Sequence, residues 1–144
     1  MIQFTIPGVP IAQPRHKVSG KHRWLPKTKA GDEHPVVAYK EEIRLRAQQE
    51  DAKPIKGPVY LYVIFVMPRP SKGKTPTRLW HASKPDLDNL VKAVQDALKG
   101  VAWKDDTQVC CASISKVYAA SDEEPHTEIS IFEAGYETKS PLIL

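Results

Sequence analysis

The chain has 144 residues, of which 41% are hydrophobic and 26% charged, and this predicts one compact domain and excludes a disordered chain. No apolar run approaches the roughly 20 residues that span a bilayer, and the first residues do not resemble a signal peptide, so we expect a soluble cytoplasmic protein with no membrane partner. Residues 1–85 hold 16 basic and 6 acidic side chains, a balance of +10, and residues 86–144 hold 5 basic and 11 acidic side chains, a balance of −6. Charged solvated surfaces are common, but this uneven distribution of charge favours a polyanionic partner.

Three segments are predicted in the N-terminal third of the chain. Residues 1–6 alternate apolar and polar side chains, which predicts a half-buried strand. An irregular stretch follows, and from residue 11 to residue 31 it carries six basic residues and no acid. Loops of this length inside small domains are usually functional or disordered. Apolar residues at helical spacing then predict an amphipathic helix from about Val36 to Gln49.

The remaining elements begin with the clearest strand of the sequence. Val59 to Met67 is a nearly continuous run of β-branched and aromatic residues, which predicts a central strand covered on both faces. Residues 68–84 are Pro-rich and basic, and apolar residues at helical spacing from Leu87 to Leu98 predict a second helix. Alternating patterns predict two final strands over residues 108–118 and 127–134.

This order of elements predicts an α+β fold. We expect a single domain over residues 1–144, with a mixed sheet of about four strands, two main helices packed on one side, and a flexible tail at residues 134–144. The adjacent Cys110 and Cys111 could form only a strained disulfide with each other, so they predict no structural staple and no zinc site.

Two acidic pairs flank the second predicted helix, Asp86 with Asp88 before it and Asp105 with Asp106 after it. Residues two apart on an ideal helix point about 200° away from each other. Asp86 and Asp88 therefore converge only if Asp86 is the non-helical N-cap and Asp88 lies in the first turn. Lys92 then lies one turn beyond Asp88 on the same polar face.

An alternative gives these aspartates purely structural roles, with no metal binding or catalysis. Aspartates at an N-cap and in a first turn satisfy free backbone N–H groups and complement the helix dipole, and an acidic pair after a helix can be a plain turn. The combination with a basic window favours the chemical explanation, because residues 52–85 hold 7 basic side chains and no acid. Clustered carboxylates repel one another unless a cation joins them, and such ligands suit Mg²⁺, with Mn²⁺ as a substitute. Metal-dependent phosphodiester hydrolysis fits both halves of the charge polarity.

The acidic motifs resemble those of the RusA family of Holliday junction resolvases, small homodimeric Mg²⁺-dependent endonucleases common in prophages. The resemblance is most specific in Asp86-Leu-Asp-Asn-Leu-x-Lys-Ala93, in Asp96-Ala-Leu98 with Gly100, and in Trp103-x-Asp-Asp-x-Gln-Val109. Pro10-x-x-x-Pro-Arg15 resembles the basic loop of the family, so the similarity covers residues 1–134.

The resemblance implies that Asp86, Asp88 and Asp106 bind Mg²⁺ and that Asp88 and Lys92 are catalytic. It also implies a homodimer that makes paired nicks in branched DNA, in recombination and repair, without a small-molecule cofactor. A metal-binding role for Asp105 stays open, because adjacent residues of an extended chain point to opposite sides. The candidates for contact with the DNA backbone are Arg15, Lys17, Lys27 and Arg69.

Several alternatives remain at this point. Trp24 and Trp80 either stack on exposed bases or pack their loops onto the domain. A non-catalytic nucleic-acid-binding module would bind DNA independently of divalent ions. A phosphatase or nuclease for small or flexible substrates would cleave single strands as fast as junctions.

Overall fold

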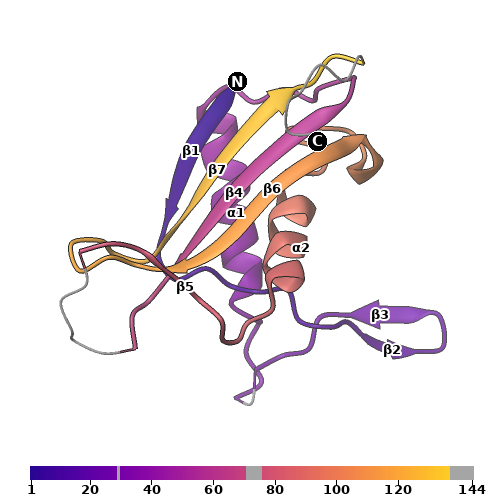
Figure 1. Ribbon diagram of the computed structural model, residues 1–144. Helices are drawn as coiled ribbons and strands as arrows, with labels where there is room; N and C mark the ends of the chain where they lie inside the picture. The colour runs from indigo at the N-terminus through magenta and orange to yellow at the C-terminus, as the bar shows by residue number, and fades with distance from the viewer. Residues whose placement is uncertain (29, 71–75, 137–144) are drawn as a thin grey trace.

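The computed structural model describes residues 1–28, 30–70 and 76–136, and its elements follow the predicted order (Figure 1). The helices are α1 (Val36–Gln49) and α2 (Leu87–Leu98), and a 3₁₀ turn, η1, spans Asp106–Gln108. The strands are β1 (Ile2–Pro7), β2 (Lys17–Ser19), β3 (His22–Trp24), β4 (Val59–Met67), β5 (Leu79–Trp80), β6 (Val109–Tyr118) and β7 (His126–Glu133). The predicted α+β fold is confirmed. Residues 71–75 of the basic stretch and 137–144 of the expected tail lie outside the described residues.

Five strands form one mixed sheet in the order β1-β7-β4-β6-β5, whereas about four were predicted. The additional strand is the two-residue β5, which pairs with the end of β6 and is too short to leave a periodic pattern in the sequence. β4 and β6 are parallel, and α2 provides the crossover that parallel neighbours require. β7 pairs antiparallel with both β1 and β4.

Both helices cover the same face of the sheet, as predicted (Figure 1). Helix α1 faces the sheet with residues at positions i, i+3 and i+4, and alternate residues of β4 point back at it. Fully burying each large apolar side chain contributes about 1.5–3 kcal/mol. An ion pair between Lys40 and Asp96, at 3.4 Å, joins α1 to α2. None of the helices in the described residues is long and apolar enough to cross a membrane.

The opposite face of the sheet is covered only toward the end of β4, where Val66 is buried in a second cluster with Val117 and Ala119, so the prediction that β4 is covered on both faces is wrong for the first part of the strand. Tyr60, Tyr62 and Ile64 alternate with the core residues of β4, and Tyr62 is 37% exposed. This face carries a shallow apolar groove of about 580 Å³ between β1, β4 and β7. A continuous apolar run predicts burial on both faces, but helices pack on only one of them here.

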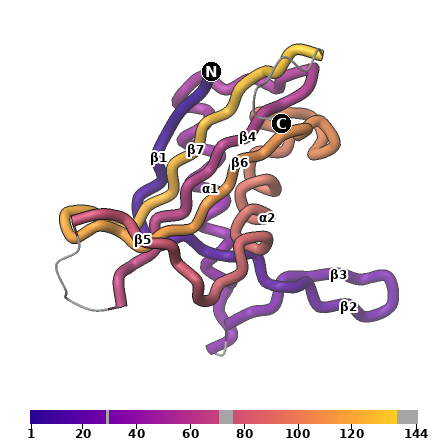
Figure 2. The backbone as a smooth tube through the Cα atoms, in the orientation of Figure 1, coloured from indigo at the N-terminus to yellow at the C-terminus, as the bar shows by residue number. Residues whose placement is uncertain are grey.

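Residues 17–24, expected to be irregular, form a hairpin that projects from the domain (Figures 1 and 2). Its two strands, β2 and β3, pair antiparallel around the two-residue loop Gly20-Lys21. Gly20 has a φ of 59°, which glycine adopts without steric cost and which suits a tight hairpin turn. All six strand residues are exposed. The strands are too short for an alternating pattern, so the turn is the only signal that the sequence offers.

Candidate active site

Asp86 and Asp88 lie at the N-terminus of α2, in the arrangement that allows them to converge. Asp86 is the N-cap, with extended backbone angles of φ −67° and ψ 142°, and Asp88 lies in the first turn. Under the capping alternative the Asp86 carboxylate accepts a hydrogen bond from a backbone N–H group, but its side chain makes no capping hydrogen bond. Both side chains are exposed. The two carboxylates are therefore available to a ligand at this end of the helix.

The backbone before and after Asp86 is held by two other segments of the chain. Lys116 of β6 donates from Nζ to the carbonyl oxygens of Ser83, at 2.5 Å, and Pro85, at 2.6 Å. The backbone N–H of Gln13 donates to the carbonyl of Asn89 at 2.9 Å. No local pattern marks Lys116 or Gln13, because these contacts join residues far apart in the sequence.

His81 also contacts β6, since its backbone N–H donates to the carbonyl of Lys116 at 3.1 Å. Its ring lies against Tyr118, with the ring centroids 4.5 Å apart. Burial, together with the positive charge of Lys116, lowers the pKa of His81. A neutral imidazole is therefore expected beside the segment that leads to Asp86.

Lys92 lies four residues after Asp88 on α2 and is exposed. Asp96, one turn further on, pairs with Lys40 of α1 at 3.4 Å. Within the part of the chain that the structure describes, the Lys92 ammonium group has no hydrogen-bond or ion-pair partner. The positive charge of Lys92 is thus available near the two carboxylates.

Asp106 lies beyond the other end of α2, in η1. The indole N–H of Trp103 donates to Asp106 Oδ1 at 2.8 Å, and Trp103 is fully buried, so this carboxylate has a fixed orientation. Its neighbour Asp105 caps η1 instead: Asp105 Oδ1 accepts from the Thr107 N–H at 3.1 Å, and Gln108 Oε1 accepts from the Asp105 N–H at 3.0 Å. The Thr107 N–H lowers the pKa of the exposed Asp105 carboxyl. Asp105 therefore has a structural use for its side chain.

A single chain does not bring the three predicted metal ligands together. Helix α2 has 12 residues and so is about 18 Å long, with Asp86 at its start and η1 beyond its end (Figure 2). Among the described residues, one group of three potential ligands has all its ligand atoms within 4.8 Å of one another, and it is a different one: Glu123, His126 and Glu128.

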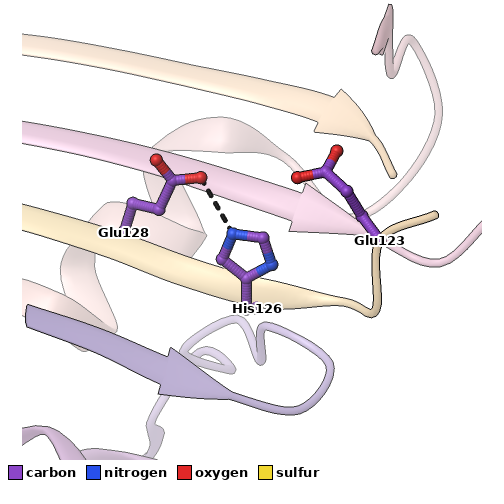
Figure 3. A group of neighbouring side chains, drawn as sticks. All are labelled: Glu123, His126 and Glu128. Carbon is purple, nitrogen blue, oxygen red and sulfur yellow. Dashed lines mark hydrogen bonds and ion pairs between the residues drawn. The ribbon is translucent and has the colours of Figure 1, made fainter. Parts of the chain in front are cut away.

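The Glu123, His126 and Glu128 cluster lies at the start of β7 (Figure 3), and both of its carboxylates form ion pairs with the Arg78 guanidinium. Arg78 Nη2 lies 2.6 Å from Oε2 of Glu123 and 2.6 Å from Oε2 of Glu128, while His126 Nε2 lies 2.8 Å from Glu128. The hydrogen bonds from Arg78 to Glu123 and Glu128 raise the pKa of the guanidinium. The cluster thus anchors the segment that carries β5, which gives a structural role to part of the acidic C-terminal region.

This anchor predicts a pH-dependent stability. The hydrogen bond from Arg78 lowers the pKa of Glu123 from 4.5 to about 2, so its contribution is fully present above pH 4.5 and is lost as the pH falls towards 2. We expect Glu123→Gln to lower the free energy of unfolding at pH 7 by on the order of 1 kcal/mol, since solvent screens the pair, and to flatten the pH dependence below 4.5. Urea unfolding from pH 7 to pH 2.5 measures both effects. Glu124→Gln, at an exposed neighbouring position, is the control, and identical pH profiles for wild type and Glu123→Gln would contradict the prediction.

Three of the four predicted DNA contacts lie in and around the hairpin. Arg15, Lys17 and Lys27 are exposed, whereas Arg69, after β4, is partly buried and already has an interaction partner. Trp80 is 77% exposed, which leaves little of its ring to pack the loop onto the domain, whereas Trp24 is 45% exposed and leaves both alternatives open. Trp80 lies in β5, directly before the segment that leads to Asp86.

Comparison with known proteins identifies the family of the chain. The family model described as endodeoxyribonuclease RusA matches residues 7–132, a range that contains all the predicted site residues. A relative from Bacillus subtilis (strain 168), described as the uncharacterized protein YqaN, is 36% identical over 142 residues, which cover 92% of this chain and 96% of the relative. The chain belongs to the RusA family of endodeoxyribonucleases.

Proposed function

We propose that this protein is a structure-selective endonuclease that resolves Holliday (four-way) junctions in DNA recombination and repair by Mg²⁺-dependent phosphodiester hydrolysis. The observation that carries the proposal is the pair of uncapped, exposed carboxylates of Asp86 and Asp88 at the N-terminus of α2, in a chain of an endodeoxyribonuclease family. Beyond complementing the helix dipole, neither carboxylate has a hydrogen-bond or ion-pair partner among the described residues, so both are available to a ligand. We therefore assign these two carboxylates to the binding of a divalent metal ion.

Asp86, Asp88 and Asp106 are the residues that would hold the metal, and Mn²⁺ is expected to substitute for Mg²⁺. Carboxylate oxygens are the donors that these hard cations prefer. The hydrogen bond from Trp103 to Asp106 is the kind of outer contact that orients a metal ligand. A bound divalent ion supplies an activated water and charge stabilisation at the departing oxygen. Lys92 would neutralise the negative charge that develops on the phosphate.

The separation of the aspartates along α2 supports a homodimer. Each chain offers Asp86 and Asp88 at one end of the helix and Asp106 near the other. A two-fold dimer that places Asp106 of a second copy beside Asp86 and Asp88 would complete two equivalent sites, because an isologous interface makes every cross-contact twice. Two sites are also what paired nicks on opposing strands require.

The basic hairpin and the residues that flank it are the proposed DNA surface. Arg15 and Lys17 lie at the base of the projecting hairpin, and Lys27 follows β3. A two-stranded ribbon has the dimensions to enter a DNA major groove, and phosphate contacts of this kind position the DNA without reading its sequence. Arg69 is the fourth candidate, and exposed Trp80 would stack on an unpaired base.

If the hairpin binds DNA, removing its positive charges should reduce the salt dependence of junction binding. We expect the double variant Arg15→Gln/Lys17→Gln to bind a four-way junction more weakly and to lower the slope of log K against log[salt] by about 2, since each phosphate contact contributes roughly 0.9. The rate at saturating protein should change little. Fluorescence anisotropy from 50 to 200 mM salt, about the range in which such contacts matter, measures the slope. Lys53→Gln/Lys56→Gln, between α1 and β4, removes the same charge, and an equal loss in that control would assign the effect to net charge alone.

A substrate panel tests the proposed function directly. A synthetic four-way junction, a linear duplex and a single strand of the same sequences are incubated with Mg²⁺, with Mn²⁺ and with chelator. We expect symmetric nicks in the junction with either metal and none with chelator. Equal cleavage of single strands would instead support a nuclease for flexible substrates, and binding without cleavage in any metal would support a non-catalytic module.

A further inference from the structure

The contacts of Lys116 have no role in the proposed function as described above. Lys116 lies on β6, and its ammonium group donates to the carbonyl oxygens of Ser83, at 2.5 Å, and of Pro85, the residue directly before Asp86, at 2.6 Å. We propose that Lys116 is a positioning residue for the metal-binding end of α2, which fixes the backbone before Asp86 so that this carboxylate has a defined direction. The inference rests on the proposed function, because it assigns Asp86 to a metal.

The segment that Lys116 holds has few other attachments. Residues 82–84 are exposed and connect β5 to the N-cap of α2. The backbone bond from His81 to the Lys116 carbonyl ties its beginning to β6. The two bonds from the Lys116 side chain tie down its end. One residue of β6 therefore holds this connection at both ends.

The surroundings of Lys116 indicate that its ammonium group interacts mainly with the carbonyl oxygens of Ser83 and Pro85. The side chain is partly buried, and among the described residues it has no carboxylate partner. Desolvating an ammonium group without a counter-ion is unfavourable, and hydrogen bonds from a charged donor are stronger and better directed than neutral ones. Such groups behind a metal ligand commonly set its orientation and hence the metal affinity. A purely structural staple would affect stability and leave the metal affinity of the folded protein unchanged.

Two substitutions separate these roles. Lys116→Met keeps the length and apolar stem but removes all three donors, and Lys116→Arg keeps charged donors. We expect Lys116→Met to weaken Mn²⁺ binding in calorimetry by about 10- to 100-fold, as for other groups behind metal ligands, and to speed hydrogen exchange in residues 86–90. Lys116→Arg should restore most of the Mn²⁺ affinity. Lys53→Met, at an exposed position between α1 and β4, should change neither the Mn²⁺ affinity nor the hydrogen exchange of residues 86–90.

The outcomes distinguish the inference from the function on which it rests. Wild-type Mn²⁺ affinity in folded Lys116→Met would overturn the inference, even if that variant were less stable. If Lys116→Met does not fold, Lys116→Gln provides the same test with one neutral donor, and its unchanged affinity would overturn the inference equally. A wild-type protein that binds Mn²⁺ but cuts no DNA would overturn the proposed function and leave the role of Lys116 standing.

Discussion

The Asp88→Asn variant is expected to lose junction cleavage and to keep junction binding. Asparagine retains the size and one acceptor oxygen of the side chain but not its charge, so it is a poor ligand for Mg²⁺. We expect the cleavage rate to fall by at least about 10³-fold, on the scale of losing a major electrostatic contribution to the transition state. Asp88 is exposed and has no hydrogen-bond or ion-pair partner among the described residues. Single-turnover cleavage in Mg²⁺ and mobility shift in chelator measure the two properties.

A matched control for this prediction lies on the same helix. Asp96→Asn removes the same charge two turns further along α2, where the carboxylate pairs with Lys40 rather than facing a ligand. This variant is expected to cleave at nearly the wild-type rate, with a small loss of stability. Equal cleavage by Asp88→Asn and wild type would remove Asp88 from the metal site, and equal loss in both variants would point to a general effect of charge on α2.

The parts of this protein that sequence predicts well are those set by local pattern. The bounds of α1 and β4 follow from periodicity and residue type over 9 to 14 consecutive positions. The N-cap position of Asp86 follows from the preference of aspartate for that position and from the start of the apolar helix pattern at Leu87. These features need no knowledge of the rest of the fold.

The parts that sequence does not predict depend on which distant segments meet. Lys116 reaches Pro85 only because β6 runs parallel to β4 and ends beside the start of α2. Arg78 meets Glu123 only because β5 joins the edge of the same sheet. The spacing of 20 residues between Asp86 and Asp106 suggests proximity, but 12 of the residues between them form a helix that carries the two apart. Closeness in sequence is a poor guide whenever a whole helix intervenes.

Mixing two inactive variants tests whether one active site is built from two chains. Asp88→Asn and Asp106→Asn are each expected to be inactive as homodimers. In a mixed dimer with shared sites, one site carries both substitutions and the other carries neither. Random exchange makes half of the dimers mixed, so about a quarter of the sites should be restored. The mixture, refolded together from denaturant, is assayed for nicking of a four-way junction.

The kind of product adds a second criterion, because a mixed dimer with one intact site nicks one strand and leaves the junction unresolved. The control is a mixture of Asp86→Asn with Asp88→Asn. Both substitutions lie at the same end of α2, so every site in their mixed dimers keeps a defect and no activity should return. Recovery in the first mixture alone would place Asp106 of one copy with Asp86 and Asp88 of the other. No recovery in either, with mixed dimers shown to form, would mean that α2 and η1 rearrange to build the site within a single chain.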